Sequence, residues 1–347
     1  MISEISKKPE RSEKSDWSEM SEMFENPGAS PSRGGHPALH QHGTIVAVGE
    51  ILFDVFPDGR RIGGAPFNFA CQLHALGFPV CFVSSVGPDE RGDELRAFMS
   101  ARGMRTDGLQ REDDLPTGVV QVSVDAAGVP AYEIVENRAY DRIRFDAHLH
   151  ERLLAEKVAL LCYGTLAQRC ASSREAIGRM LAALGGQVLA VCDLNLRQAF
   201  YSRELILDCL GAAKLLKLNE EELRTVEQLF GEERAQPEEA FAQALVERHD
   251  LLGLCVTRGE KGSELFLREG AVIRQPAGAA TIVDTVGAGD AFTAMLCAGY
   301  LIGAPWATTL ELASRFAGGL CSVRGALPED DGFYTPFRNE LEGLIKP

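Results

Sequence analysis

Residues 284–292 of the chain read DTVGAGDAF, which has the pattern of a strand end, a glycine-rich turn and a helix start. The β-branched residues 281–283 predict the end of a strand, and the apolar residues 291–298 predict a largely buried helix. Gly287 and Gly289 allow the backbone to come close to a ligand. Because the first amide groups of a helix lack internal partners and lie at the positive end of its dipole, this turn predicts an anion-binding site.

Asp290, inside this stretch, carries a charge that would repel a bound phosphate. A carboxylate at that place is useful if it takes a proton from an attacking hydroxyl group, as phosphoryl transfer to an alcohol requires. Two other interpretations stay open, namely a helix-capping aspartate and an ordinary tight turn. A dinucleotide-binding fingerprint fits less well, because Phe292 stands where its third small residue is expected.

The composition limits the classes of protein to consider. With 347 residues, 45% of them hydrophobic, the chain is long enough for one or two domains with a full core. Its formal net charge of −15 argues against nucleic acid as a partner. Nine cysteines without a C-x-x-C pair favour a reducing cytoplasm over metal binding. No apolar run approaches the ~20 residues of a membrane span.

Residues 1–42 differ in composition from the rest of the chain. They are rich in Ser, Glu, Lys and Pro and show no apolar periodicity, so we predict a disordered tail. The tail also lacks the apolar segment of a signal peptide, which agrees with a cytoplasmic location. The folded domain is expected to occupy residues 43–347.

From residue 44 onward, short apolar runs alternate with helical patterns. This alternation predicts an α/β protein with a mostly parallel central sheet and helices on both of its faces. The predicted strands are 44–48, 80–86, 158–163, 188–192, 215–218 and 254–257. The predicted helices are 67–76, 90–102, 173–184 and 220–230, with two more after the strand at 281–283.

Two segments interrupt the alternation of strands and helices. Residues 51–62 and 117–137 contain extended runs with no helix between them, which predicts a small antiparallel sheet beside the main one. A sheet in that position is suited to act as a lid that excludes water from a reaction.

An early glycine-rich block carries side chains suited to a sugar. Gly63 and Gly64 permit close backbone approach, and Asn68 has both hydrogen-bond donors and an acceptor. Asp54 follows an apolar run, at the edge of the sheet where ligands of such folds bind. The alternative is that Asp54 caps a turn and Asn68 caps a helix.

Polar residues also follow the strand at 188–192. Strand alternation places Asp193, Asn195 and Arg197 on one side, where they would form a ligand site or a structural salt bridge.

Two further clusters follow later strands. Asn219 and Glu222 have the spacing of a capping box, and they are alternatively placed to hold a hydrated Mg²⁺ near phosphates. Thr257 and Gly259 either contact a nucleotide phosphate or form a hairpin turn.

Taken together and in this order, these motifs resemble those of the ribokinase-like (PfkB-type) carbohydrate kinases. The stretch 284–292 is similar to the family's C-terminal signature, Gly63 and Gly64 with Asn68 to its N-terminal one, and Asn219 with Glu222 to its N-x-x-E motif. The resemblance covers the chain from residue 44 onward. Within the family, the chain is most similar to fructokinases in four places, which are residues 49–50, 164–169, 193–197 and 217–220.

The resemblance implies a role for each matching residue. Asp290 would be the general base, and the backbone of Gly287, Ala288 and Gly289 would form the anion hole. The implied sugar-binding residues are Asp54, Gly63, Gly64, Asn68, Arg169, Asp193 and Asn195. The implied ATP-binding residues are Lys217, Asn219, Thr257, Gly259 and Gly262. The implied metal sites are Asn219 and Glu222 for Mg²⁺ through water, and Asp284 with carbonyl groups near 323–326 for a monovalent cation such as K⁺.

These implications predict a kinase that transfers the γ-phosphate of ATP to a sugar, with fructose as the first substrate to consider and a homodimer formed through the lid. Ribose, a nucleoside and 2-keto-3-deoxygluconate stay open as substrates. The last of these is an acid that needs a cation, for which Arg138, Arg169 and Arg197 are candidates. A different class of function is a regulator that binds a sugar or nucleotide without catalysis. An intact Gly287–Asp290 stretch argues against it, since a regulator has no need of the base.

Overall fold

The computed structural model describes residues 37–124, 130–230, 237–278 and 280–345. Most of the predicted tail, up to residue 36, lies outside the described residues. Helix α2 (Pro37–His40) belongs to its last part, and Leu39 in that helix is fully buried in the core. The folded part of the chain therefore begins before residue 43, where the composition placed the boundary.

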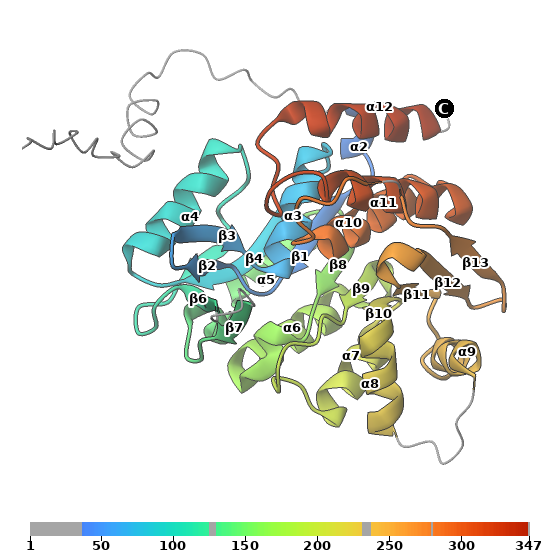
Figure 1. Ribbon diagram of the computed structural model, residues 1–347. Helices are drawn as coiled ribbons and strands as arrows, with labels where there is room; N and C mark the ends of the chain where they lie inside the picture. The colour runs from blue at the N-terminus through green and yellow to red at the C-terminus, as the bar shows by residue number, and fades with distance from the viewer. Residues whose placement is uncertain (1–36, 125–129, 231–236, 279, 346–347) are drawn as a thin grey trace, which may run out of the picture. The chain divides into compact units, whose positions relative to one another are not determined.

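A nine-stranded sheet forms the centre of the described chain, in the order β13-β12-β11-β10-β9-β8-β1-β4-β5 (Figure 1). The strands from β11 to β5 in this order are parallel, and β12 and β13 add an antiparallel edge. The prediction of a mostly parallel sheet is confirmed. The strands are β1 (Thr44–Val48), β4 (Val80–Val86), β5 (Leu109–Arg111), β8 (Val158–Tyr163), β9 (Leu189–Asp193), β10 (Leu215–Asn219), β11 (Gly253–Thr257), β12 (Ser263–Leu267) and β13 (Val272–Gln275).

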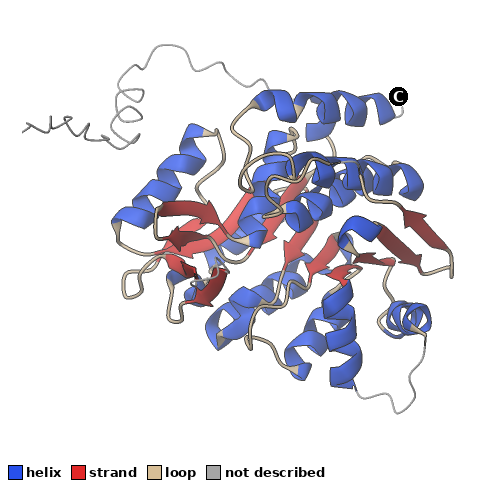
Figure 2. Cartoon of the chain, viewed as in Figure 1, coloured by secondary structure: helices blue, strands red, loops and turns tan. Residues whose placement is uncertain are grey.

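Both faces of the sheet are buried under helices (Figure 2). Ile45 and Ala47 of β1 belong to one hydrophobic cluster, and Val46 and Val48 belong to the other, because side chains alternate along a strand. The first cluster is covered by α3 (Ala65–Ala75), α4 (Glu90–Ala101), α10 (Ala288–Leu301), α11 (Trp306–Leu320) and α12 (Thr335–Leu344). The second is covered by α5 (Ala147–Ala155), α6 (Ala171–Leu184), α7 (Arg203–Ala212), α8 (Glu220–Phe230) and α9 (Glu238–Arg248).

A separate four-stranded sheet, which we call the lid sheet, has the order β3-β2-β6-β7. Its strands are β2 (Leu52–Phe56), β3 (Gly59–Gly63), β6 (Gly118–Val124) and β7 (Pro130–Ile134). The pairs β2–β3 and β6–β7 are antiparallel, but β2 and β6 are parallel. The prediction of a small second sheet is confirmed, but the sheet is mixed and not wholly antiparallel, because its central pair β2–β6 is parallel. Since β2 follows β1 and β6 follows β5, two parallel strands of the main sheet, both hairpins start in the same direction.

Two predictions for the C-terminal part are also wrong. Residues 281–283 form no strand, and Ile282 and Val283 are exposed to 70% and 61%. Among the described residues no strand pairs with them, and the amide groups of Val283 and Asp284 instead donate to the carbonyl oxygen of Cys321. In the part of the chain that the structure describes, three α-helices follow this loop where two were expected, and the first of them, α10, is largely buried as predicted.

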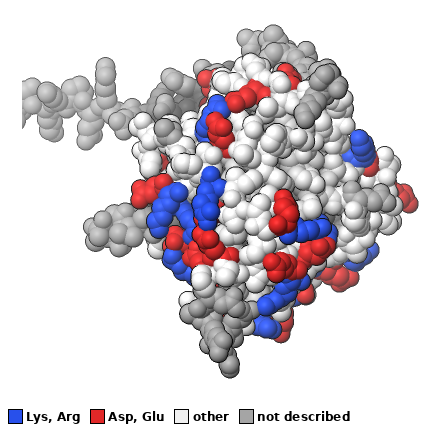
Figure 3. Space-filling view, turned by 90° about the vertical axis from the view of Figure 1, so that its right-hand side faces the viewer, with Lys and Arg blue, Asp and Glu red and all other residues white. Residues whose placement is uncertain are grey.

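The charged side chains are mixed on the face drawn in Figure 3, where Lys and Arg stand beside Asp and Glu. The ion pairs of the described residues show the same mixing, and the guanidinium of Arg258, for instance, contacts Glu220, Glu238 and Glu264. Within the described part of the chain, no helix is long and apolar enough to cross a membrane.

Candidate active site

The turn before α10 has the backbone geometry of an anion site. Gly287 is the N-cap residue and has a φ of 78°, which glycine adopts readily. A Cβ atom on Gly287 would lie 2.5 Å from the Cβ atom of Ala326, so the loop after α11 packs closely behind the turn. The amide group of Ala288, one of the three predicted residues, donates to the carbonyl oxygen of Thr285 at 3.3 Å.

Asp290 is the third residue of α10 and not its cap, because the N-cap is Gly287 and no side chain caps this helix. The carboxylate of Asp290 accepts a hydrogen bond of 2.8 Å from Nδ2 of Asn68, which is 222 positions away in the sequence. Burial and then the charge of Asp193 raise the pKa of Asp290 to about 6, against the opposing effects of Asn68, Lys217 and Arg197. A carboxyl group with this pKa is suited to accept a proton near neutral pH.

A buried charge network lies under the start of α10. Nζ of Lys217 donates to the two carboxylate oxygens of Asp193 at 3.1 and 3.2 Å, and Oγ1 of Thr293 donates to Asp193 at 2.7 Å. Nζ of Lys217 also lies 3.1 Å from the place where a Cβ atom of Gly289 would stand. Burial lowers the pKa of Lys217, but the charges of Asp193, Glu222 and Asp290 outweigh it and the pKa is raised. Lys217 therefore places a positive charge behind the turn.

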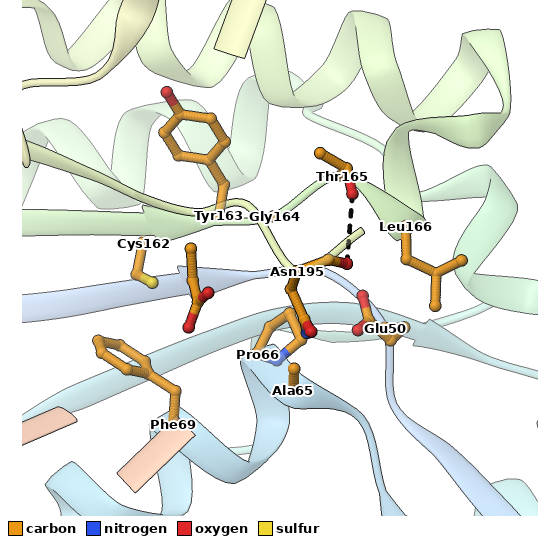
Figure 4. A pocket seen from close by; sticks show the side chains of 11 residues that line it. Glu50, Ala65, Pro66, Phe69, Cys162, Tyr163, Gly164, Thr165, Leu166 and Asn195 are labelled. Carbon is orange, nitrogen blue, oxygen red and sulfur yellow. Dashed lines mark hydrogen bonds between the residues drawn. The ribbon is translucent and has the colours of Figure 1, made fainter. Parts of the chain in front are cut away.

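Asp193 and Asn195 line one pocket, although not for the predicted reason. Strand β9 ends at Asp193, and Asn195 has a φ of 45°, so the alternation of a strand does not continue to Arg197. The pocket encloses about 310 Å³ of space, part of it open to solvent. Figure 4 shows its lining side chains, which come from the start of α3 and the ends of β1, β8 and β9. They are Glu50, Ala65, Pro66, Phe69, Cys162, Tyr163, Gly164, Thr165, Leu166, Asp193 and Asn195.

Glu50 is a charged pocket residue to which our sequence reasoning assigned no role. It is 4% exposed, lines the pocket, and has a pKa that burial raises to about 7. The charge of Arg197 acts in the opposite direction on this carboxyl group. The available signal was its position two residues after the buried strand β1, at the sheet edge where Asp193 and Asn219 end strands β9 and β10.

Gly63 and Gly64 connect the lid sheet to α3, and Asp54 lies on the neighbouring strand β2. A Cβ atom on Gly63 would lie 2.7 Å from Oδ2 of Asp54, and one on Gly64 would lie 2.5 Å from the carbonyl oxygen of Glu50. The glycines thus permit close packing within the protein itself. Burial raises the pKa of Asp54 to about 6, while the charges of Arg197 and Arg61 lower it. Asp54 does not serve as a turn cap, since it lies inside strand β2.

Arg169 is held in a buried ion pair at the end of the lid sheet. Its guanidinium donates to both oxygens of Asp141 at 2.8 and 2.9 Å and to the carbonyl oxygen of Val135 at 2.9 Å. The rings of Tyr140 and Phe200 lie 5.0 and 4.7 Å from the guanidinium carbon. These contacts give Arg169 a structural role between the lid sheet and the loop after β8.

Asn219 and Glu222 form the predicted capping box. Oδ1 of Asn219 accepts from the amide group of Glu222 at 2.9 Å, and Oε2 of Glu222 accepts from the amide group of Asn219 at 2.8 Å. The other carboxylate oxygen of Glu222 accepts from the amide group of Leu196. In the described ranges, no group of three or more His, Cys, Asp or Glu side chains is placed to hold a metal. These residues therefore fit Mg²⁺ only as partners of its water molecules.

Thr257 and the two glycines after it lie at the same sheet edge as Asn219. Thr257 is the direct register partner of Asn219 between β11 and β10. Gly259 begins a short 3-10 turn, which ends before Gly262. A Cβ atom on Gly262 would lie 2.1 Å from the carbonyl oxygen of Gln275, so this glycine has a packing role.

Asp284, the residue considered for a monovalent cation, already has three partners. Its carboxylate accepts from the amide groups of Val286 at 3.1 Å and Gly325 at 3.0 Å. One guanidinium nitrogen of Arg61, on strand β3, lies 3.8 Å from its Oδ2 atom. A cation at this carboxylate therefore fits only where Arg61 does not compete for Oδ2.

Comparisons with known proteins place the chain among carbohydrate kinases. A family model described as "pfkB family carbohydrate kinase" matches residues 50–330. Fructokinase-2 of Oryza sativa subsp. japonica is 28% identical over 289 residues, which cover 78% of this chain and 82% of the relative.

Solved structures share the fold. The fructokinase of Xylella fastidiosa with bound ATP has a TM-score of 0.74 at 22% identity and covers 86% of this chain and 98% of its own. The nucleoside kinase of Burkholderia thailandensis in complex with inosine has a TM-score of 0.67 at 20% identity, with 87% and 98% covered.

Proposed function

The chain belongs to the pfkB family of carbohydrate kinases, and we propose that it transfers the γ-phosphate of ATP to a hydroxyl group of fructose. The observation that carries the proposal is the contact between Asp290 and Asn68 beside the Gly287 turn. It supports the proposal because it brings the proposed base and a proposed sugar-binding side chain together beside the proposed anion site. The similarity to rice fructokinase-2 favours fructose among the sugars.

In the proposed reaction, Asp54, Asn68 and the pocket that Glu50 and Asn195 line bind the sugar. Asp290 takes the proton of the acceptor hydroxyl group while its oxygen forms a bond to the γ-phosphorus. The bond from that phosphorus to the bridging oxygen of ADP breaks, and the amide groups at Gly287 and Gly289 stabilise the charge on the transferred group.

On the nucleotide side, we propose that Lys217, Asn219, Thr257, Gly259 and Gly262 lie along bound ATP. The register of β10 and β11 supports this proposal, because it aligns Asn219 with Thr257 at one sheet edge. Mg²⁺ bound to ATP neutralises phosphate charge, and Asn219 and Glu222 would hold its water molecules.

An ATP-coupled assay over a panel of sugars tests the proposal. We expect the largest kcat/KM with fructose, in comparison with ribose, a nucleoside and 2-keto-3-deoxygluconate. Faster turnover of 2-keto-3-deoxygluconate would instead indicate that its carboxylate binds Arg197. This arginine is exposed, and its charge acts on Glu50, Asp54 and Asp290. Sugar binding without turnover of any sugar would favour a non-catalytic regulator.

We further propose a bound K⁺ ion, a homodimer and a cytoplasmic location. A K⁺ ion at Asp284 predicts faster turnover in KCl than in tetramethylammonium chloride. A homodimer through the lid sheet predicts twice the chain mass in light scattering. A cytoplasmic location agrees with nine free cysteines, seven of them buried.

A further inference from the structure

Two neighbouring arginines on strand β3 point in opposite directions. Arg60 lies over the ring of Phe53 at 5.3 Å and pairs with Glu94 on α4. Arg61 lies over the ring of Phe56 at 4.7 Å and faces Asp284. The division follows from strand geometry, since successive side chains of a strand point to opposite faces of its sheet. Arg61 therefore shares one face of the lid sheet with Asp54, its register partner on β2.

Arg61 lies between a proposed sugar-binding residue and the loop of the proposed phosphate site. On one side is Asp54, a proposed sugar-binding residue, whose carboxyl group feels the charge of Arg61. On the other side, a nitrogen of Arg61 lies 3.8 Å from Asp284, whose carboxylate accepts from the amide group of Val286. Val286 directly precedes Gly287. The guanidinium thus reaches from the lid sheet to the loop that forms the anion site.

The contact that holds Arg61 in this structure is weak. The side chain of Arg61 is 39% exposed, and its distance to Asp284 is that of a long ion pair. Phosphate oxygens offer a guanidinium two short, charge-assisted hydrogen bonds, which are stronger than one long pair with a carboxylate. A phosphate bound at the Gly287 turn would therefore compete well for Arg61.

We propose that Arg61 is a catalytic residue through which the lid sheet contacts the γ-phosphoryl group during transfer. This inference rests on the proposed kinase function. In the transfer, the sugar oxygen bonds to the γ-phosphorus, the bond to the bridging oxygen of ADP breaks, and the hydroxyl proton goes to Asp290. Arg61 leaves Asp284 and binds the non-bridging oxygens of the moving group, where it offsets their negative charge.

The test compares Arg61→Gln with Arg60→Gln, which removes the same charge from the neighbouring position on the opposite face. We expect Arg61→Gln to lower kcat roughly 10²-fold, as the loss of one donor to a transition state does. It should also weaken binding of a non-hydrolysable ATP analogue while the affinity for ADP, which lacks the γ-phosphate, stays unchanged. Arg61→Lys should recover part of both losses, and Arg60→Gln should leave both quantities at the wild-type level.

A purely structural link between Arg61 and Asp284 gives a different result. In that case Asp284→Asn would reproduce the loss of Arg61→Gln, the double variant would lose no more than either, and analogue and ADP would weaken together. Any of these outcomes, or equal kinetics for Arg61→Gln and Arg60→Gln, overturns the proposal. If the wild-type protein phosphorylates no sugar, the kinase function fails, and a selective loss of analogue binding in Arg61→Gln still shows the phosphate contact.

Discussion

At the level of single residues, the carboxyl group of Asp290 differs from that of an exposed aspartate in its pKa. Burial and the charge of Asp193 raise that pKa to about 6, and Asn68 holds one of its oxygens. Burial also raises the pKa of Glu50 to about 7 and that of Asp54 to about 6. Three carboxyl groups that titrate near neutral pH are therefore gathered around the proposed sugar site.

Replacement of Asp290 by asparagine tests the proposed general base. Asp290→Asn keeps the size of the side chain and removes its basic oxygen, so kcat should fall by ~10² or more while ATP still binds. Steady-state kinetics and a binding titration measure the two effects. Asp208→Asn is the matched control, because Asp208 is exposed and pairs with Arg174 on the surface. Turnover of Asp290→Asn close to that of the wild type would contradict the mechanism.

The pH dependence of turnover follows from the same pKa. Since the base must be ionised, kcat/KM should fall as pH decreases below about 6, the pKa of Asp290. A carboxyl group with a raised pKa binds its proton more tightly in the folded state, so it contributes stability that is lost as pH rises from about 4 to about 6. The loss of activity between pH 7 and 5 should therefore occur without a fall in Tm. A profile that stays flat down to pH 4.5 would exclude Asp290 as the base.

At the level of secondary structure, the turn before α10 depends on two properties of Gly287. Its φ is 78°, and a Cβ atom would meet Ala326 at 2.5 Å. Gly303, after the other end of α10, has a φ of 73° but no neighbour within 4 Å of such a Cβ atom. A comparison of substitutions at Gly287 and Gly303 therefore distinguishes two contributions to stability. Both sites require a positive φ, but only Gly287 also packs against Ala326.

Alanine at each of these glycines should therefore give different results. Gly303→Ala should lower the free energy of unfolding by about 1–2 kcal/mol, the cost of a left-handed alanine, with normal kcat. Gly287→Ala should lower it further and reduce kcat at least tenfold, because Ala326 must move away from the anion site. Thermal unfolding and kinetics on both variants check this. Equal effects of the two substitutions would show that the contact with Ala326 is unimportant.

Helix α3 supports the site through two side chains, one turn apart. Asn68 donates to Asp290, and Nε2 of the fully buried Gln72 donates to the carbonyl oxygen of Ala326 at 2.7 Å. The residue behind Gly287 is thus held by the same helix that holds the proposed base. This arrangement makes Gln72 a positioning residue, which does not contact substrate itself.

Gln72→Leu should leave the carbonyl oxygen of Ala326 without its partner, at a cost of roughly 1–3 kcal/mol. We expect kcat to fall about tenfold with little change in KM for sugar, because the shift affects the anion site. Gln243→Leu is the matched control, since Nε2 of Gln243 on α9 also donates to a carbonyl oxygen, that of Leu267. Unchanged kcat in Gln72→Leu would limit this residue to a role in stability.

At the level of the whole molecule, the N-terminal boundary of the folded domain has a clear test. Removal of residues 2–36 should leave kcat and Tm unchanged, because the composition of this segment predicts a disordered tail that adds nothing to the core. Removal of residues 2–42 also deletes Leu39, which is fully buried, and should cost roughly 2 kcal/mol or more. Calorimetry on both shortened proteins distinguishes them. A loss of activity on removal of residues 2–36 alone would assign the tail a role in the site.

The pattern of the chain was sufficient to predict most of the central sheet. The apolar runs at 80–86 and 158–163 coincide with β4 and β8, because both faces of these strands are buried. The same criterion failed at residues 281–283, whose β-branched side chains face solvent. The β-branched residue types indicate a preference for the strand conformation. A strand also needs a neighbouring strand with which to form hydrogen bonds.

Within the candidate site, the residues with a local signature were predictable. Gly287, Asp290 and the capping box of Asn219 and Glu222 each depend on spacing along the chain. The roles of Arg61 and Gln72 had no such signature, because their partners, Asp284 and Ala326, are more than 200 positions away.

The sequence by itself determined the alternation of strands and helices, the glycine turn and the presence of a carboxylate in it, since these follow from residue type and spacing. Only the tertiary structure decided the hydrogen bonding, the neighbouring charges and the pKa of that carboxylate. It placed Asn68 against Asp290, buried Asp193 with Lys217 beneath α10, and raised the pKa of Asp290 to about 6. The physical reason is that pKa and hydrogen bonding depend on groups within a few ångströms in space, and the fold assembles them from distant strand ends and helix starts.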